Sequence, residues 1–200
     1  MPGRPAFELD ADEIVQAAVE ILRDQGLDAV SMRTVAARLG VSPVPLYSRI
    51  GNKESLLDAM SCHLLANAVP DQEPGEPWQV YALRWATALR DRLLATTDLL
   101  RLLGHRRSPY VEVSRPLIEA LGKAGFAPDV AVRACRLVVW TTVAGTLVEP
   151  SRFEGKRGTS SRPRIGDAPA MSVAEAEQLF ELHLRYLVEG IERDAARAAQ

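Results

Sequence analysis

Residues 31–60 read SMRTVAARLGVSPVPLYSRIGNKESLLDAM, and this stretch decides the fold. It predicts a short helix carrying Val35 and Leu39, a tight turn at residues 40–42, and a second helix over residues 43–50. Two short helices joined in this way form a helix-turn-helix, whose second helix is the part that enters a DNA major groove. We therefore expect the stretch to present residues 43–50 to an outside partner.

Helix-start residues stand where this motif needs them. Ser31 and Ser42 each precede a helical run and can accept hydrogen bonds from first-turn amides. Pro43 and Pro45 remove no helical hydrogen bond there, because first-turn amides have no partner within the helix. Asn52 is expected to cap the next helix, which we predict to run to about residue 69.

The charges of this stretch differ from those of the whole chain. No Asp or Glu occurs from residue 31 to 53, where Arg33, Arg38, Arg49 and Lys53 are basic, although the formal net charge of the chain is -2. A local positive surface of this kind is what a DNA contact needs. The alternative is that the four residues are simply solvated.

The stretch resembles the DNA-binding domain of the TetR family of bacterial transcriptional repressors, at residues 40–42, 46–47, 52–53 and 56–57. The resemblance reaches back to Ile14 and covers about the first third of the chain. It implies an all-α dimer with an N-terminal three-helix helix-turn-helix head and a C-terminal helical body. We expect a DNA-binding domain at 1–52, a connecting helix at 53–69, and a ligand-binding and dimerisation domain at 77–200, after a linker at 70–77.

The same resemblance assigns DNA-contacting positions. Arg33 matches an arginine that reaches a guanine edge, and residues 43–45 match the base-facing start of the recognition helix. That start contains no Gln or Asn for adenine, so we expect apolar contacts with thymine methyl groups. The full predicted set is Arg33, Pro43, Val44, Pro45, Tyr47, Ser48, Arg49 and Lys53.

Helical periodicity continues outside the motif. A first helix is expected from Asp10, with Glu13 in capping-box spacing, to Gly26. Further helices are expected at 77–95, 99–104, 114–124 (with Pro116 in its first turn), 128–148 and 173–198, the last launched by a Ser172–Glu175 capping box. Residues 150–171 predict a long loop.

The body is expected to hold a small effector and to form the dimer. The resemblance implies pocket residues Trp85, Leu89, Leu93, Leu103, His105, Tyr110, Leu117, Trp140, Thr141 and Val143, although aromatic residues at helical spacing are more often simply core. Two unusually apolar helices, 128–148 and 173–198, predict a four-helix interface between two copies; the alternative is that both helices pack only inside one subunit. Its expected residues are Ala134, Leu137, Val138, Thr141, Gly145, Leu179, Leu182, Tyr186 and Gly190.

Other classes of function have less support in the sequence. The three histidines lie in different segments with no catalytic constellation, so we expect no enzyme, no cofactor and no metal site, and we expect buried, reduced thiols at Cys62 and Cys135. Without an apolar N-terminal run or a convincing membrane span, the protein is expected in the cytoplasm. Val69 and Leu103 stand where relatives that bind tetracycline have histidines, which argues against a metal-chelated tetracycline. The prediction is a ligand-responsive homodimeric repressor of a palindromic operator, released by a mostly apolar effector; the alternative is a DNA-binding regulator that is constitutive or controlled by a protein partner.

Overall fold

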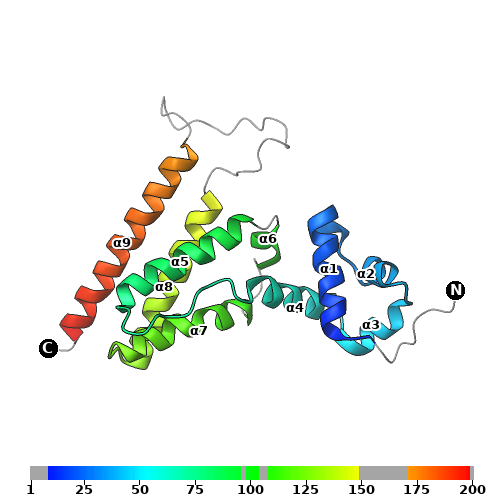
Figure 1. Ribbon diagram of the computed structural model, residues 1–200, viewed down its shortest axis with the longest axis horizontal. Coiled ribbons are helices and arrows are strands. Elements are labelled where there is room, and N and C mark those ends of the chain that lie inside the picture. The colour runs from blue at the N-terminus through cyan, green and yellow to red at the C-terminus, as the bar shows by residue number, and fades with distance from the viewer. Residues whose placement is uncertain (1–8, 96–97, 104–107, 149–170, 199–200) are drawn as a thin grey trace. The chain divides into compact units, whose positions relative to one another are not determined.

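The computed structural model describes residues 9–95, 98–103, 108–148 and 171–198, and the regular structure in these ranges is helical (Figure 1). The helices are α1 (Ala11–Gln25), the 3-10 helix η2 (Leu27–Ala29), α2 (Met32–Leu39), α3 (Pro43–Ile50), α4 (Lys53–Leu65), α5 (Trp78–Ala95), α6 (Leu99–Leu103), α7 (Ser108–Lys123), α8 (Pro128–Val148) and α9 (Val173–Ala198). The all-α prediction is confirmed. The predicted loop at 150–171 lies outside the described residues except for Met171.

The chain divides into two compact units, one made of residues 1–68 and 95–113 and the other of 69–94 and 114–200. This division differs from the predicted domains at 1–52, 53–69 and 77–200. α4 belongs to the first unit, and so does the segment 95–113, which we had placed in the body. We call the two units the head and the body.

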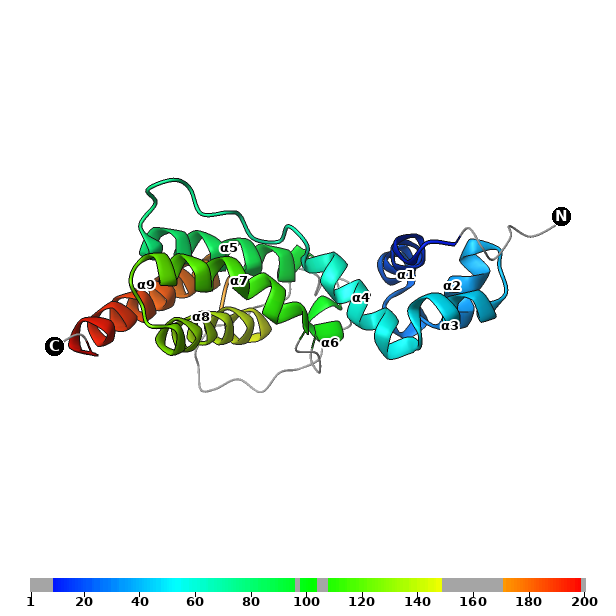
Figure 2. The same cartoon turned by 90° about the horizontal axis from the view of Figure 1, so that it is seen from below.

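The head is built around α1, which packs against α2, α3 and α4 (Figure 2). Ile14, Ala18 and Ile21 recur on one face of α1 and are fully buried. Leu46 of α3 and Leu56 of α4 are also fully buried in this unit. Burial of this α1 stripe holds the two helices of the helix-turn-helix in place.

Local capping fixes several of the head's helix ends. The Ser31 hydroxyl accepts from the Thr34 amide at 3.1 Å, and the Asn52 side chain accepts from the Ser55 amide at 3.0 Å, so both caps are confirmed. Gly40 ends α2 at φ 69°, a left-handed conformation that favours glycine in the turn. The predicted side-chain caps at Asp10 and Ser42 were wrong, because both residues occupy the N-cap position without a side-chain hydrogen bond.

The body consists of α5, the later part of α7, α8 and α9. Trp85, Leu89 and Leu117 are fully buried in it, and Trp78 meets Phe126 edge-to-face with ring centroids 5.2 Å apart. α8 and α9 lie side by side (Figures 1 and 2), where a Cβ on Gly145 would stand 3.5 Å from the Phe180 ring. The Ser172–Glu175 capping box forms as predicted, with the Glu175 amide 3.1 Å from the Ser172 hydroxyl.

Two helix bounds differ from the prediction. α4 ends at Leu65 instead of about residue 69, and α7 begins at Ser108 instead of Ser114. Pro116 therefore lies inside α7 and not in its first turn. Within α8, Pro128–Leu147 is long and apolar enough to cross a membrane by length and composition alone, a test that core helices also pass. From the sequence we describe 128–148 as unusually apolar and expect no convincing membrane span.

Candidate nucleic-acid interface

α3, the second helix of the helix-turn-helix, has one buried anchor and an exposed opposite face. Leu46 is the residue of α3 that is fully buried, whereas Val44 is 74% and Tyr47 54% exposed. An exposed valine and tyrosine on one short helix leave apolar and aromatic surface in solvent. The helix therefore offers side chains that can meet a groove without unpacking the head.

The start of α3 has few backbone hydrogen-bond donors. Pro43 and Pro45 have no amide hydrogen, and the Ser42 side chain makes no cap bond. The Ser48 hydroxyl donates to the Pro45 carbonyl at 2.8 Å. The start of this helix is therefore largely apolar, with Val44 exposed and the two prolines half-buried.

Basic side chains lie on α3 and on the helices before and after it. Arg33 is exposed in the first turn of α2, Arg49 is exposed in the last turn of α3, and Lys53 is exposed as the first residue of α4. Residues 31–53 contain no acidic residue, and Glu54 follows directly in α4. The predicted DNA-contacting side chains thus belong to one helix-turn-helix and the start of the helix after it.

Arg38 does not belong with this basic set, which corrects the sequence analysis. Its guanidinium donates to Asp24 at 2.9 Å and to Glu20 at 3.3 Å, both on α1. The hydrogen bond to Asp24 is the main cause that raises the pKa of Arg38. Arg38 therefore braces α2 against α1.

The outer side of α1 is unsuited to phosphate. An open groove of about 600 Å³ there is lined by Asp12, Glu13, Gln16, Ala17, Glu20, Arg38, Leu39 and His63. Its carboxylates repel a polyanion. This side of α1 therefore differs in charge from residues 31–53, which contain no acidic residue.

The segment 98–103 adds contacts to the head that the sequence analysis missed. The Leu27 amide donates to Asp98 at 3.1 Å, and the Arg101 guanidinium binds Asp98 and Asp28, each at 3.0 Å. Leu99 of α6 is fully buried. Only the spacing of Asp98 and Arg101, one helical turn apart, could have indicated part of this cluster from the sequence.

The predicted effector residues are placed in different surroundings. Trp85, Leu89, Leu93 and Leu117 are buried in the body, where Thr141 and Val143 are half-buried. Leu103 and Tyr110 belong to the head unit, and His105 lies outside the described residues.

Trp140 corrects the predicted pocket, because it is 69% exposed. The groove that the body does show, about 640 Å³ and open, is lined by residues of α5 and α9 outside the predicted set. These are Val80, Leu83, Arg84, Thr87, Ala88, Asp91, Glu181, Leu184 and Arg185.

The predicted dimer residues divide into two groups. Leu137, Leu179, Leu182 and Tyr186 are 40%, 51%, 37% and 61% exposed. Ala134 and Val138 are instead buried within the body of one chain, while Thr141, Gly145 and Gly190 are half-buried. The exposed apolar residues of α8 also include Trp140 and Leu147.

The two cysteines of the described part of the chain differ in burial. No group of three or more His, Cys, Asp or Glu side chains is placed to hold a metal ion among the described residues. Cys135 is buried, and this burial raises the pKa of its thiol to about 11. Cys62 is half-buried, whereas we had expected it to be buried.

Comparison with known proteins agrees with this geometry. The family model described as bacterial regulatory proteins, tetR family, matches residues 14–60. The tetracycline repressor protein class A from transposon 1721 of Escherichia coli is 29% identical over 202 residues, which cover 92% of this chain and 91% of the relative. Together with the structures below, these matches extend the likeness from the head to nearly the whole chain.

Two solved structures share the fold. Streptomyces coelicolor ActR in complex with actinorhodin has a TM-score of 0.77 and 27% identity, covering 96% of this chain and 99% of that one. BioQ with its double-stranded DNA operator has a TM-score of 0.66 and 27% identity, covering 92% and 98%. The helix-turn-helix geometry and these matches lead to one conclusion: residues 14–60 form a head of the tetR family of bacterial regulatory proteins, and the chain resembles regulators of that family over nearly its whole length.

Proposed function

We propose that the protein is a cytoplasmic, homodimeric repressor that binds a palindromic operator through α3 and is released by a small, mostly apolar effector. The observation that carries this proposal is the anchoring of α3 by buried Leu46, with Val44 and Tyr47 exposed on the helix and no acidic residue from 31 to 53. The operator complex of BioQ supports the DNA part by analogy. The actinorhodin complex of ActR supports the effector part in the same way.

The DNA contacts follow from side-chain chemistry. Arg33 is proposed to bind a guanine edge, since guanidinium and the guanine O6/N7 pair match in a bidentate contact. Val44, between the two prolines Pro43 and Pro45, is proposed to meet a thymine methyl group. The side chains proposed to bind phosphate are Tyr47, Ser48, Arg49 and Lys53.

Dimerisation is proposed through α8 and α9. Leu137, Trp140, Leu179 and Tyr186 leave large apolar side chains in solvent on these two adjacent helices. Exposed apolar surface of this extent is typical of an interface. Two copies packed through α8 and α9 would form a four-helix interface with twofold symmetry, which suits a palindrome whose half-sites are about 34–36 Å or a multiple apart.

The effector is proposed to bind the body near Trp85, Leu89 and Leu117, the buried residues of the predicted set in that unit. Trp140 is left out of this site because of its exposure. The domain roles proposed here are DNA binding by the head and effector binding with dimerisation by the body. The competing proposal is a constitutive or partner-controlled regulator.

The experiment selects a duplex from random DNA with the wild-type protein and then measures the affinity of variants for it. Arg33→Ala should weaken the selected duplex by about 1–3 kcal/mol and relax the preference at one base pair per half-site. Lys123→Ala is the control, since Lys123 is an exposed residue at the end of α7 in the body. Selection of no palindrome, or an equal Arg33→Ala loss on every base variant, would contradict the proposal.

A further inference from the structure

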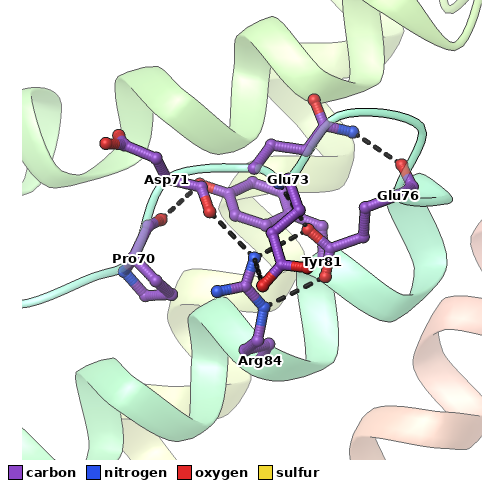
Figure 3. Close-up of polar contacts among 7 residues, drawn as sticks. Pro70, Asp71, Glu73, Glu76, Tyr81 and Arg84 are labelled. Atoms are coloured by element: carbon purple, nitrogen blue, oxygen red, sulfur yellow. Dashed lines mark hydrogen bonds and ion pairs between the residues drawn. The ribbon is translucent and has the colours of Figure 1, made fainter.

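The segment between α4 and α5 is fastened to α5 by side-chain contacts, although its prolines and glycine predicted a linker. We call residues 70–76 the strap. The Arg84 guanidinium donates from Nε to Glu76 Oε1 at 3.0 Å and from Nη2 to Glu76 Oε2 at 2.7 Å (Figure 3). Nη2 also donates to the Asp71 carbonyl at 2.8 Å. One arginine of α5 therefore holds both ends of the strap.

A second residue of α5 reinforces the beginning of the strap. The Tyr81 hydroxyl donates to the Pro70 carbonyl at 2.9 Å, and the Arg84 guanidinium carbon lies 5.6 Å from the centre of the Tyr81 ring (Figure 3). Tyr81 is fully buried, and Tyr81 and Arg84 stand one helical turn apart on α5. Their spacing places two donors along the same face of the helix.

The strap also bonds within itself, and Glu76 is the centre of these bonds. The Glu73 amide donates to Glu76 Oε2 at 3.0 Å, the Glu76 amide donates to the Glu73 carbonyl at 3.1 Å, and Gln72 Nε2 donates to the Glu76 carbonyl at 2.9 Å. The Glu76 side chain is only 9% exposed. Its carboxylate therefore satisfies an arginine and a backbone amide together, which a solvated linker would not need.

From this geometry we infer that Arg84 and Glu76 are positioning residues that make the strap a rigid extension of α5, so that bending within the connection from α4 to α5 is confined to residues 66–69. Ala66 leaves the helix at ψ 130° and Asn67 has φ 56°, so the backbone changes direction there before the strap begins. A bidentate arginine–carboxylate pair fixes orientation as well as distance. This inference goes beyond the proposed function, because it concerns the joint that follows the head's α4.

A confined joint has a consequence for DNA recognition. In a dimer that binds two half-sites, a stiff joint allows few separations between heads, whereas a loose strap allows more. Inserting one base pair at the centre of a palindrome moves the half-sites apart by about 3.4 Å and rotates them. The wild-type protein should therefore discriminate strongly between the two duplexes.

The first experiment measures single-residue amide exchange in the full-length protein. The Glu73 and Glu76 amides report on the strap, and Leu89, buried in the middle of α5, reports on wider opening. Arg84→Met should raise exchange at both strap amides at least tenfold and leave Leu89 within twofold. In Arg84→Lys, exchange at the strap amides should lie between that of the wild-type protein and that of Arg84→Met, because lysine keeps the charge but lacks the forked guanidinium group.

Lys123→Met is the matched control, because it removes a positive charge from an exposed site in the same unit. It should change exchange at the Glu73 amide less than twofold. Wild-type exchange at Glu73 in Arg84→Met, or an equal increase at Leu89, would overturn the rigid strap.

The second experiment compares affinities for a palindrome selected in vitro by the wild-type protein and for the same duplex with one base pair inserted at its centre. Arg84→Met should lower the ratio of the two dissociation constants at least threefold, while Lys123→Met should keep it. A variant with a merely structural defect would weaken both duplexes alike, and an unchanged ratio would refute the positioning role. If the wild-type protein selects no palindrome, the proposed function fails, and the exchange experiment alone decides the strap.

Discussion

Val44 and Leu46 lie two positions apart on α3. Substitution of Leu46 should lower the stability of the fold, whereas substitution of Val44 should weaken DNA binding. Leu46 is fully buried, whereas Val44 is 74% exposed. Leu46→Ala removes three carbon atoms, worth roughly 2.4 kcal/mol of transfer free energy at about 0.8 kcal/mol each. With the cavity left behind, the free energy of unfolding should fall by about 3 kcal/mol. That is a large share of the roughly 5–15 kcal/mol typical of a domain.

Val44→Ala should behave in the opposite way. Its unfolding free energy should stay within about 0.5 kcal/mol of the wild-type value, because an exposed side chain leaves no cavity. Loss of the proposed contact between the valine and a thymine methyl group should weaken operator binding by about 1 kcal/mol, or roughly fivefold. Urea unfolding at one fixed protein concentration and titration of a labelled operator measure the two quantities.

Replacing the operator thymines with uracil removes their methyl groups and tests the cause of the Val44 effect. On the uracil duplex the wild-type protein should bind about as weakly as Val44→Ala, and the variant should lose nothing further. A Val44→Ala penalty of the same size on both duplexes would refute the methyl contact. An unfolding loss in Val44→Ala as large as that in Leu46→Ala would refute the placement of both side chains.

Three more predictions concern charges. Lys53→Ala should weaken specific and non-specific DNA binding alike and reduce the slope of log affinity against log salt by roughly one unit per bound subunit; an unchanged slope would remove Lys53 from the interface. Arg38→Ala should lower the melting temperature but leave the slope of log affinity against log salt unchanged, because the Arg38 guanidinium already binds Asp24. A reduced slope would show that Arg38 contacts DNA. The hydrogen bond from Arg84 lowers the pKa of Glu76 below its ordinary 4.5, so its stabilisation is present above that value and lost as the pH falls through the lowered pKa. Melting curves should therefore show a shallower acid decline in Glu76→Gln, and an unaltered decline would contradict the assignment.

The features that the sequence predicted well depend on bonds between near neighbours. Ser31, Asn52 and Ser172 cap helices through amides three residues ahead, so the residues that make each bond are visible in the sequence. Asp10 has similar spacing and makes no side-chain cap bond. The three-residue spacing permits a side-chain cap but does not ensure that the hydrogen bond forms.

Features that depend on tertiary contacts could not be predicted. Arg38 looked like the other basic residues of the motif, and only the packing of α2 on α1 brings it within 2.9 Å of Asp24. Trp140 looked like a core aromatic because α8 is apolar nearly all round. Periodicity cannot tell which apolar face a neighbouring helix covers, and this face is 69% exposed at Trp140.

α6 shows why the effector site is harder to predict than the DNA-binding surface. The Leu27 amide and Asp98 are 71 positions apart in sequence, yet they share a hydrogen bond of 3.1 Å within the head. Leu103, predicted to line the effector pocket, is 1% exposed in that same unit. A substitution at Leu103 that abolishes operator binding would therefore report on the packing of the head. A Leu103 substitution is evidence about the effector site only when it changes the effector affinity and leaves the free energy of unfolding unchanged.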